Sequence, residues 1–373
     1  MEHIGAREEI LKDVQIKESR LREFMQQQDL DAIILNRQEN FAWFTCGGDN
    51  RVIITSESGF AYLVITATKK WIVAHSIDLQ RFLEEQVAGQ GYEAVNLFWY
   101  EGSPLEKALE LVKGKSVGAD VPAPGTRFLG SEIIALHTPF TDLEIQRLRW
   151  VGKTSHMLLD QIAREIIPGM SELEIAAQIQ EAYTRHDMTL DVLIVGVDER
   201  IRRYRHPLPT GRGLERYALL HPAARRWGLH ANVTRLVHFG QPPDEIRRAV
   251  DGVLTIEGRI MGMLSEGVRY ADILAAQKQW YADVGFPEDW KYHFQGGTTG
   301  YGLADPTHSM NPAATVKNRI AFDYFVTITG AKAENLALLT DGGLEIVSWG
   351  EGWPMRSIQT SSGEIEVPDM LIR

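Results

Sequence analysis

The spacing of apolar positions divides the N-terminal part of the chain into alternating helices and strands. Residues 16–29 carry apolar side chains at helical intervals, and the apolar run 31–35 follows directly, which predicts a helix leading into a strand. Further strands are expected at 51–55, 61–65, 71–75 and 116–120, and further helices are expected at 78–88 and 104–113. This alternation is typical of a sheet covered by helices, so residues 1–140 are predicted to form an α/β domain.

After this domain the pattern changes to long helices and then to glycine-rich strands. Thr141 followed by Glu144 is a capping box, and Ser171 followed by Glu174 is another, which predicts two long helices. A strand is expected next at 191–197, followed by two β segments, 217–222 and 230–239, that are joined by a hairpin turn. Two helices are expected after them, at 243–264 and 270–284. We therefore predict a second domain, of the α+β class, over residues 141–373.

Composition and charge narrow the class of protein. The 373 residues are 44% hydrophobic and 24% charged, which is ordinary for a globular protein of two domains. The net charge of −11 disfavours a nucleic-acid partner, because binding to phosphates needs a basic face. Cys46 is the single cysteine, which favours a reducing compartment. No run of 18 apolar residues and no signal-like N-terminal segment occurs, so we expect a cytoplasmic protein without a membrane partner.

Four polar or glycine-rich segments follow one another in the C-terminal domain. They are Asn232-Val-Thr-Arg235, His293-Phe-Gln-Gly-Gly-Thr-Thr-Gly300, Asn318-Arg-Ile-Ala-Phe-Asp323 and Gly330-Ala-Lys-Ala-Glu334-Asn. Together with Asp29-Leu-Asp-Ala-Ile-Ile-Leu35 and Glu39-Asn-Phe-Ala-Trp-Phe-Thr45, they resemble segments of the M24 peptidases, which include aminopeptidase P, prolidase, methionine aminopeptidase and creatinase. The resemblance covers nearly the whole chain. It implies a creatinase-like N-terminal domain, a C-terminal domain with the pita-bread fold, and a homodimer.

The resemblance also implies where the family's five metal ligands, Asp, Asp, His, Glu and Glu, would stand. The two Asp positions are His221 and Asn232, eleven residues apart, and the His position is Gly297. Asp323 and Glu334 keep acids at the two Glu positions. Two carboxylates in place of four are too few for two divalent ions, so no cofactor is predicted. One ion held by His221, Asn232 and Glu334 stays open as an alternative.

Without a metal, Asp323 and Glu334 would face each other in a partly buried pocket. Two close carboxylates either share a proton or hold a cation between them, and His221 is placed to be that cation. A carboxylate, a carboxylic acid and an imidazole form a general acid–base system. The other interpretation is a satisfied polar network left over from an ancestral site.

Two more histidines lie at positions where the resemblance implies contact with substrate. His206 precedes the hairpin at the spacing of a histidine that acts as the catalytic base in creatinase, and His293 opens the glycine-rich motif. We expect His206, His221, Asp323 and Glu334 to be catalytic. We expect His293, Asn232 and Arg235 to bind substrate. His308, in the loop after the glycine motif, could approach the same pocket.

These residues support a first hypothesis of a metal-independent enzyme that hydrolyses a C–N bond in a small polar substrate. The same groups could run an elimination or a cyclisation. A second hypothesis is an Xaa-Pro peptidase with one unusual metal ion. A third is a module without catalytic activity that holds a peptide in the pocket.

Overall fold

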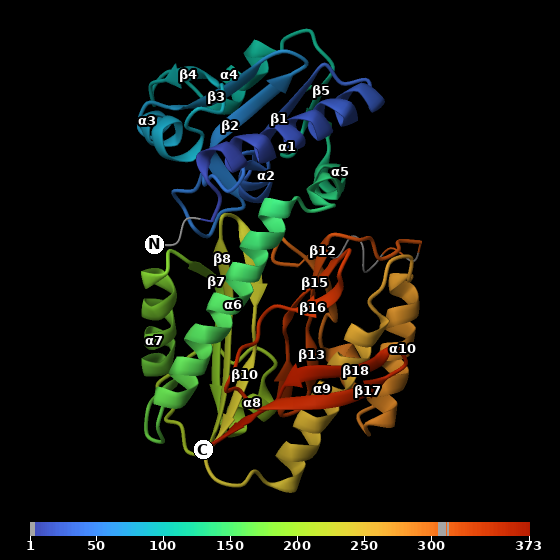
Figure 1. Cartoon of the computed structure of the whole chain (residues 1–373). Coiled ribbons are helices and arrows are strands. Elements are labelled where there is room, and N and C mark those ends of the chain that lie inside the picture. Colours follow the sequence, from blue (N-terminus) through green and yellow to red (C-terminus); the bar gives the residue numbers. More distant parts are fainter. Residues whose placement is uncertain (1–3, 305–310, 312) are drawn as a thin grey trace. The chain divides into compact units, whose positions relative to one another are not determined.

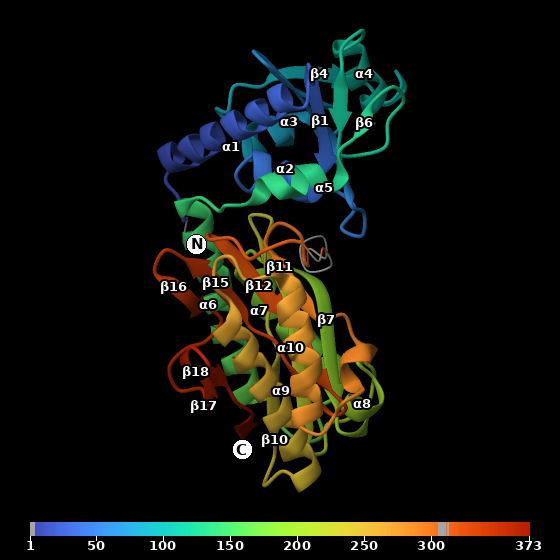
Figure 2. The same cartoon turned by 90° about the vertical axis from the view of Figure 1, so that its right-hand side faces the viewer.

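The computed structural model describes residues 4–304, 311 and 313–373. The chain divides into two compact units, Met1–Leu143 with Trp227–Leu229, and Glu144–Arg226 with His230–Arg373. We call them the N-terminal unit and the C-terminal unit. Each has its own sheets and its own apolar core (Figures 1 and 2).

A six-stranded mixed sheet, in the order β4-β3-β2-β1-β5-β6, forms the N-terminal unit. Its strands are β1 (Ala32–Arg37), β2 (Ser58–Thr66), β3 (Lys70–His75), β4 (Glu93–Leu97), β5 (Val117–Ala119) and β6 (Arg127–Phe128). β1 pairs antiparallel with β2 and parallel with β5, and its first four residues are fully buried. The apolar run predicted as a strand is therefore an inner strand covered on both faces.

Helices surround this sheet, as the alternating pattern predicted. They are α1 (Arg7–Gln27), α2 (Gln38–Phe44), α3 (Leu79–Arg81), α4 (Pro104–Leu111) and α5 (Gly130–Ile134), with a π-helical turn at Phe82–Gln86 and a 3-10 turn at Ala135–His137. Ser103 caps α4 by accepting a hydrogen bond from Leu105 N at 3.2 Å, and Pro104 is the first helical residue.

Residues 51–55 do not form the strand predicted for them. Arg51 N donates to Asp49 Oδ1 at 2.8 Å, and Ser56 N donates to Ile53 O at 3.4 Å, so the segment makes local turn bonds and no ladder bonds. Ile54 is 76% exposed. An apolar run of this length indicates a strand only when a neighbouring strand pairs with it, and here local hydrogen bonds prevail.

The helices of the C-terminal unit are long apart from α8. They are α6 (Asp142–Glu165), α7 (Glu172–Arg185), α8 (Glu199–Arg203), α9 (Asp244–Met263) and α10 (Tyr270–Asp283), with a 3-10 turn at Asp289–Tyr292. The predicted box before α7 is confirmed, because Ser171 Oγ accepts from Glu174 N at 3.2 Å and Glu174 Oε2 accepts from Ser171 N at 2.7 Å. α8 lies between the predicted strand at 191–197 and the predicted β segment at 217–222, where the sequence analysis assigned no element. Within the described residues, no helix is both long and apolar enough to span a bilayer.

The strands of the C-terminal unit form two larger sheets, β19-β10-β8-β7 with β9 beside β8, and β11-β12-β15-β16, and two separate hairpins, β13-β14 and β17-β18. They are β7 (Thr189–Val197), β8 (Tyr217–Arg226), β9 (Leu229–Asn232), β10 (Arg235–His238), β11 (Gly296–Thr299), β12 (Ile320–Tyr324), β13 (Val326–Ile328), β14 (Ala331–Ala333), β15 (Leu336–Thr340), β16 (Gly343–Ile346), β17 (Met355–Thr360), β18 (Gly363–Pro368) and β19 (Leu371–Ile372). α9 packs on β13, β14, β17 and β18, and α10 lies beside α9 (Figure 2).

The pairing of β11 with β12 places the glycine-rich motif next to Asp323. Gly297 stands directly opposite Asp323 in this antiparallel pair. At Gly296 the backbone has φ +79°, and a Cβ would lie 2.2 Å from the carbonyl oxygen of Asp323, so only glycine fits there. This close approach explains why glycine stands at position 296 of the glycine-rich motif.

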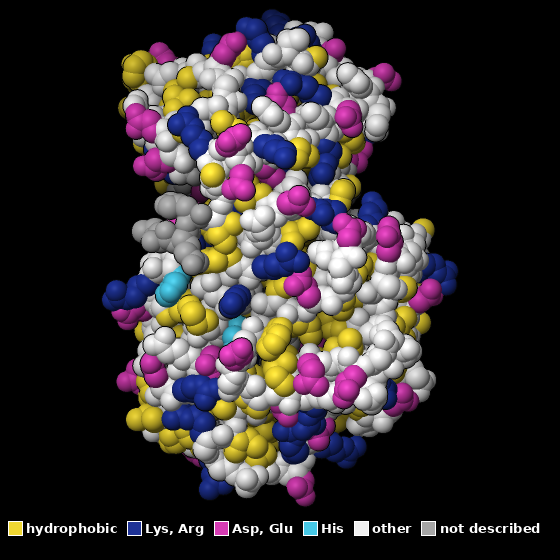
Figure 3. All heavy atoms as spheres, viewed as in Figure 1, with side chains coloured by type: hydrophobic (Ala, Val, Ile, Leu, Met, Phe, Trp, Pro, Cys, Tyr) yellow, Lys and Arg dark blue, Asp and Glu magenta, His cyan; other side chains and the backbone are white. Residues whose placement is uncertain are grey.

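Charged side chains are mixed in sign on the face shown in Figure 3. Lys and Arg side chains of the described residues alternate there with Asp and Glu, and hydrophobic side chains show between them. This face therefore offers no extended basic area of the kind that binds nucleic acid.

Candidate active site

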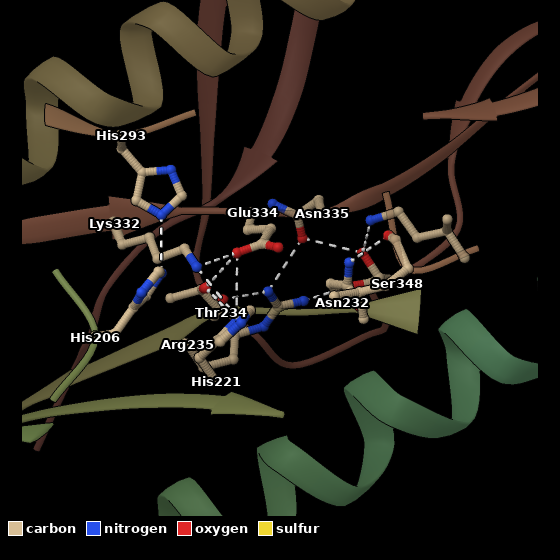
Figure 4. A network of polar contacts seen from close by, with 12 residues as sticks. His206, His221, Asn232, Thr234, Arg235, His293, Lys332, Glu334, Asn335 and Ser348 are labelled. Atoms are coloured by element: carbon tan, nitrogen blue, oxygen red, sulfur yellow. Dashed lines mark hydrogen bonds and ion pairs between the residues drawn. The ribbon is translucent and has the colours of Figure 1, made fainter. Parts of the chain in front are cut away.

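Polar side chains from several strands of the C-terminal unit gather in one buried cluster (Figure 4). They are His221 on β8, Asn232 at the end of β9, Thr234 between β9 and β10, Asp323 on β12, Lys332 on β14 and Glu334 directly after β14. The structure thus brings together the predicted residues His221, Asn232, Asp323 and Glu334. It adds a lysine that the sequence analysis did not assign.

Lys332 and Glu334 form an ion pair at the centre of the cluster. Lys332 Nζ lies 2.6 Å from Glu334 Oε2, and these residues are 5% and 1% exposed. Thr234 Oγ1 donates to the same carboxylate oxygen at 3.3 Å. A buried pair of this kind persists because each charge would be strongly destabilised without the other.

His221 is a neutral member of the cluster. Lys332 Nζ donates to His221 Nε2 at 3.4 Å, so that nitrogen is the acceptor and Nδ1 carries the hydrogen, which points to Thr234 Oγ1 at 3.0 Å. Burial lowers the pKa of His221 well below its usual value, and the positive charge of Lys332 lowers this pKa further. The prediction that His221 is the cation between the acids is therefore wrong, because Lys332 supplies that charge.

Asp323 is a buried acid with weak hydrogen-bond support. It is 1% exposed, neither of its carboxyl oxygens accepts a hydrogen bond of good geometry from the described residues, and its polar neighbours are the Glu334 carboxylate and the Asn232 amide. Burial raises the pKa of Asp323 well above its usual value, and the nearby negative charge of Glu334 raises this pKa further. Burial also raises the pKa of Glu334, but the Lys332 ammonium opposes that shift. We therefore assign the proton to Asp323 and the negative charge to Glu334.

His206 and His293 form a pair next to Lys332 (Figure 4). Their Nε2 atoms lie 2.9 Å apart, which requires one donor and one acceptor. His293 Nδ1 points at the carbonyl oxygen of Phe294 and must carry a hydrogen, so His293 Nε2 accepts and His206 Nε2 donates. The lone pair of His206 then resides on Nδ1. His206 is exposed, so water reaches this ring.

Both rings of this pair are uncharged at neutral pH. Burial lowers the pKa of His293 to about 4. Burial and then the charge of Lys332 lower the pKa of His206. A neutral imidazole with an oriented ring and a free Nδ1 lone pair is a base, and His293 holds it in that tautomer.

The sequence matches family models over most of its length. The model of metallopeptidase family M24 matches residues 146–324, and the model of the creatinase/prolidase N-terminal domain matches residues 18–123. This chain belongs to the M24 family. Membership makes it a hydrolase with the pita-bread fold in its C-terminal unit. A sequence search among curated proteins found no significant match.

Solved M24-like structures share the fold at low sequence identity. Dipeptidase PepE from Mycobacterium ulcerans is 17% identical with a TM-score of 0.76, and the alignment covers 97% of this chain and 98% of that one. The X-Pro aminopeptidase from Thermotoga maritima is 17% identical with a TM-score of 0.75 and coverage of 95% and 99%. The N-terminal domain of the FACT complex subunit SPT16 from Cicer arietinum is 11% identical with a TM-score of 0.66 and coverage of 90% and 97%.

The donors at the M24 ligand positions do not fit divalent ions. Gly297 has no side chain, and the ammonium of Lys332 already occupies the coordinating side of Glu334. Among the described residues, no three His, Cys, Asp or Glu side chains are arranged to hold an ion. A protonated acid, a carboxylate and an ammonium together sum to zero charge, so this cluster has little attraction for a further cation.

Asn232 and Arg235 differ in what they can offer a substrate. Asn232 Nδ2 donates to Leu303 O at 3.2 Å and its amide lies next to Asp323, whereas its buried Oδ1 has no partner among the described residues. Arg235 is buried, and its guanidinium donates to Thr234 O at 2.7 Å and to Asn335 Oδ1 at 3.0 Å. These contacts join the start of β10 to Asn335, the residue that follows Glu334. A direct substrate contact by Arg235 stays a prediction, as do the catalytic roles.

Lys332 was missed although its segment was already matched to the family. In an extended strand, residues two apart share a face, so Lys332 and Glu334 point the same way. That rule would have found the ion pair. The contacts of Lys332 with His221 and of His206 with His293 span 111 and 87 positions, and no local pattern reveals them. His308 lies outside the described residues.

Proposed function

We propose that this M24 member hydrolyses a C–N bond in a small polar substrate, such as an amide, ureido or guanidino compound, without a metal ion. The observation that carries the proposal is that a neutral base, His206, and a neutral acid, Asp323, both lie within reach of the charge of Lys332. His206 has an unprotonated Nδ1, and Asp323 keeps its proton because of burial and Glu334. Proton-transfer catalysis needs these two opposite states at the same pH.

The proton transfers follow from the two residues. His206 Nδ1 takes a proton from water as the water oxygen bonds to the substrate carbon. The carboxyl of Asp323 gives its proton to the leaving nitrogen as the C–N bond breaks. A second transfer from the imidazolium of His206 to the Asp323 carboxylate, through water or product, restores the starting state. Atoms and charge balance in this cycle without a co-reactant.

Lys332 and Asn232 have supporting roles in the proposal. The ammonium of Lys332 lies in the same cluster and stabilises negative charge that develops on a substrate oxygen. The free Oδ1 of Asn232 accepts a hydrogen bond from a substrate N–H. Glu334 acts by holding Lys332 in place, and His293 acts by holding the ring of His206. A homodimer and a cytoplasmic location remain predictions.

The test begins with protein purified and assayed with a chelator. A panel of amide, ureido, guanidino and Xaa-Pro compounds is screened, and His206→Ala is compared with the wild type. We expect loss of turnover by about 10²- to 10⁴-fold with an unchanged circular dichroism spectrum. His186→Ala, at the end of α7 and outside the cluster, is the matched control and should turn over normally. Normal turnover by His206→Ala would remove the assigned base.

The single-metal Xaa-Pro peptidase is the rival that the same experiment addresses. Its activity would appear only after addition of Mn²⁺, Co²⁺ or Zn²⁺ and would coincide with close to one bound ion per chain. The peptide-binding module is the other rival, and it would bind peptides while the wild type turns over no compound of the panel. Either result would replace the proposal.

A further inference from the structure

Two phenylalanines continue a row of rings that begins at His206. The ring centres of His206 and His293 lie 4.9 Å apart, and those of His293 and Phe325 lie 5.8 Å apart. Phe294 extends the row, with its ring centre 6.0 Å from that of Phe325. The interplanar angles are 82°, 84° and 73°, which is the edge-to-face arrangement that aromatic rings favour. We call these four rings the aromatic row.

The aromatic row lies directly beside the polar cluster. Phe325 N donates to Gln295 O at 3.1 Å, which ties the residue after β12 to the segment that leads into β11. Lys332 Nζ lies 5.6 Å from the centre of the Phe325 ring and 2.6 Å from Glu334 Oε2. Phe325 therefore contacts both the ammonium of the cluster and the pair of histidines.

Part of the aromatic row is open to solvent and borders a cavity. His206 is exposed and Phe294 is 40% exposed, while His293 and Phe325 are partly buried. His293 and Phe294 also line a cavity of about 490 Å³. A lone exposed phenylalanine needs no explanation, but this one continues toward the ring of the proposed base and borders a space large enough for a small molecule. The row thus offers a ligand a contact surface next to His206.

The charges near the aromatic row favour a neutral ligand. The Lys332 ammonium already lies beside the Phe325 ring, so it would repel a cation placed on the same ring. In the described cluster, Glu334 is paired with Lys332 and Asp323 keeps its proton, so neither carboxyl offers an unpaired negative charge to a guanidinium. An uncharged amide or ureido group fits these surroundings better.

We propose that the substrate is a neutral amide or ureido compound with an aromatic ring, and that this ring packs on Phe294 and Phe325 while the C–N bond lies beside His206. This inference rests on the hydrolase proposed above and narrows its substrate class. Contacts with a part of the substrate that does not react orient the reacting bond relative to the base. Phe294 and Phe325 are then residues that determine specificity, and they take no part in proton transfer.

Phenylurea, methylurea, cyclohexylurea and phenylguanidine are the probes for this contact. Their binding to the full-length wild type is followed by NMR titration of the imidazole signals of His206 and His293. We expect phenylurea to bind on the order of tenfold more tightly than methylurea, because its ring buries apolar surface. It should bind about threefold more tightly than cyclohexylurea, because only a flat ring makes edge-to-face contacts. Phenylguanidine has nearly the same shape as phenylurea but carries a positive charge, so it should bind more weakly.

The ranking of the probes decides the proposal. Equal affinities for phenylurea and either of the other two ureas, or tighter binding of phenylguanidine, would overturn it. Binding of phenylurea that leaves the signals of both histidines unchanged would overturn it as well.

Three variants locate the ring of the ligand. Phe294→Ala and Phe325→Leu should each lower the preference for phenylurea over methylurea by about threefold or more. Phe60→Ala is the control, because Phe60 lies on β2 in the N-terminal unit and is 37% exposed, close to the 40% of Phe294. Full preference in both Phe294→Ala and Phe325→Leu would contradict the proposed contact. If Phe325→Leu fails to fold, Phe294→Ala, whose ring lies at the surface, decides alone.

Turnover separates this inference from the hydrolase itself. With an aromatic substrate, Phe294→Ala should raise KM and keep the pH profile of the wild type, because the proton transfers are unchanged. Turnover of aliphatic amides as efficient as that of aromatic ones would contradict the substrate class and leave the mechanism in place. A preference for phenylurea without turnover of any compound would support the aromatic contact and contradict the mechanism.

Discussion

Two buried aspartates, one in each unit, are used in opposite ways. Asp120 follows β5 in the N-terminal unit and accepts hydrogen bonds from Asn36 N at 2.8 Å, Arg37 N at 3.0 Å and Asn40 Nδ2 at 2.9 Å. Asp323 in the C-terminal unit is just as inaccessible to solvent but accepts no hydrogen bond of good geometry from the described residues. Asp120 accepts hydrogen bonds that hold the end of β1 and the start of α2. Asp323 holds a proton, and we propose that it transfers this proton to the substrate.

The pKa values of the two groups follow from these surroundings. Burial raises the pKa of Asp120 to about 6, and the bonds from Asn40, Asn36 and Arg37 limit the rise, so the group is mostly ionised at pH 7. Burial raises the pKa of Asp323 well above its usual value, with Glu334 adding to the shift. The donors around Asp120 and the negative charge of Glu334 beside Asp323 therefore separate the protonation states of the two acids. A buried acid whose pKa is raised by a charged neighbour is a candidate for proton-transfer chemistry.

The substitution Asp323→Asn should produce the largest effect. An amide cannot supply the acidic proton, so turnover should fall by about 10²- to 10⁴-fold. Because Asp323 is already uncharged and an amide N–H can replace its hydrogen bond to Glu334, stability should change by less than about 1 kcal/mol. Kinetics on the substrate found in the screen and urea unfolding measure the two quantities. Wild-type turnover would show that this acid is not the proton donor.

Removing the ammonium from the cluster is the next largest change. Lys332→Met should cost about 3–5 kcal/mol of unfolding free energy, because it leaves the Glu334 carboxylate buried and unpaired beside Asp323. The double variant Lys332→Met/Glu334→Gln should recover most of that loss. Lys291→Met is the control, since its partner Glu288 is exposed and such pairs contribute at most about 1 kcal/mol. Equal losses for the two lysines would contradict a buried charge pair.

The matched substitution in the N-terminal unit, Asp120→Asn, should affect stability alone. It turns one acceptor oxygen into a donor that faces the donors Arg37 N and Asn40 Nδ2, so about 2–3 kcal/mol should be lost. Turnover per folded molecule should stay normal. Urea unfolding followed by circular dichroism, together with the assay, measures both. If Asp120→Asn is harmless while Asp323→Asn unfolds the chain, the comparison of the two acids is reversed.

Sequence patterns predicted most elements because each is decided by neighbours along the chain. The capping box at Ser171 and the apolar run of β1 are local, and both are confirmed. The hairpin turn is local too, with Trp227 and Gly228 at positive φ. The segment 51–55 failed because strand formation depends on a partner strand, and the apolar residues alone do not specify one.

The site was predicted only in part for a related reason. Motif positions located Asp323, Glu334 and His221, but the charge of His221 depends on Lys332, which reaches it from β14. A count of carboxylates along the sequence leaves out the Lys332 ammonium, which lies next to Glu334 in the folded chain. The tautomer of His206 depends in the same way on His293 and on the carbonyl of Phe294.

The smallest expected effect is in the pH dependence of turnover. His206 must be neutral to act, and its pKa is lowered from 6.5, so turnover should fall with acid only below pH 6.5. Asp323 must be protonated, so turnover should fall again as the pH rises through its raised pKa. The residual activity of Asp323→Asn should lose this alkaline decline and keep the acid one. A decline that persists in that variant would assign the alkaline limb to another group.

Asp120→Asn separates catalysis from stability in the same profile. The folded-state pKa of Asp120, about 6, lies above the usual value of 3.8, so its contribution to stability is complete below the lower value and is lost as the pH rises through 6. Unfolding of the protein near pH 6 would lower turnover in the same way as the titration of a catalytic group. Circular dichroism across the same pH range detects it, and the normalised turnover of Asp120→Asn should keep both limbs unchanged. A shifted limb in this variant would mean that the two acids are coupled.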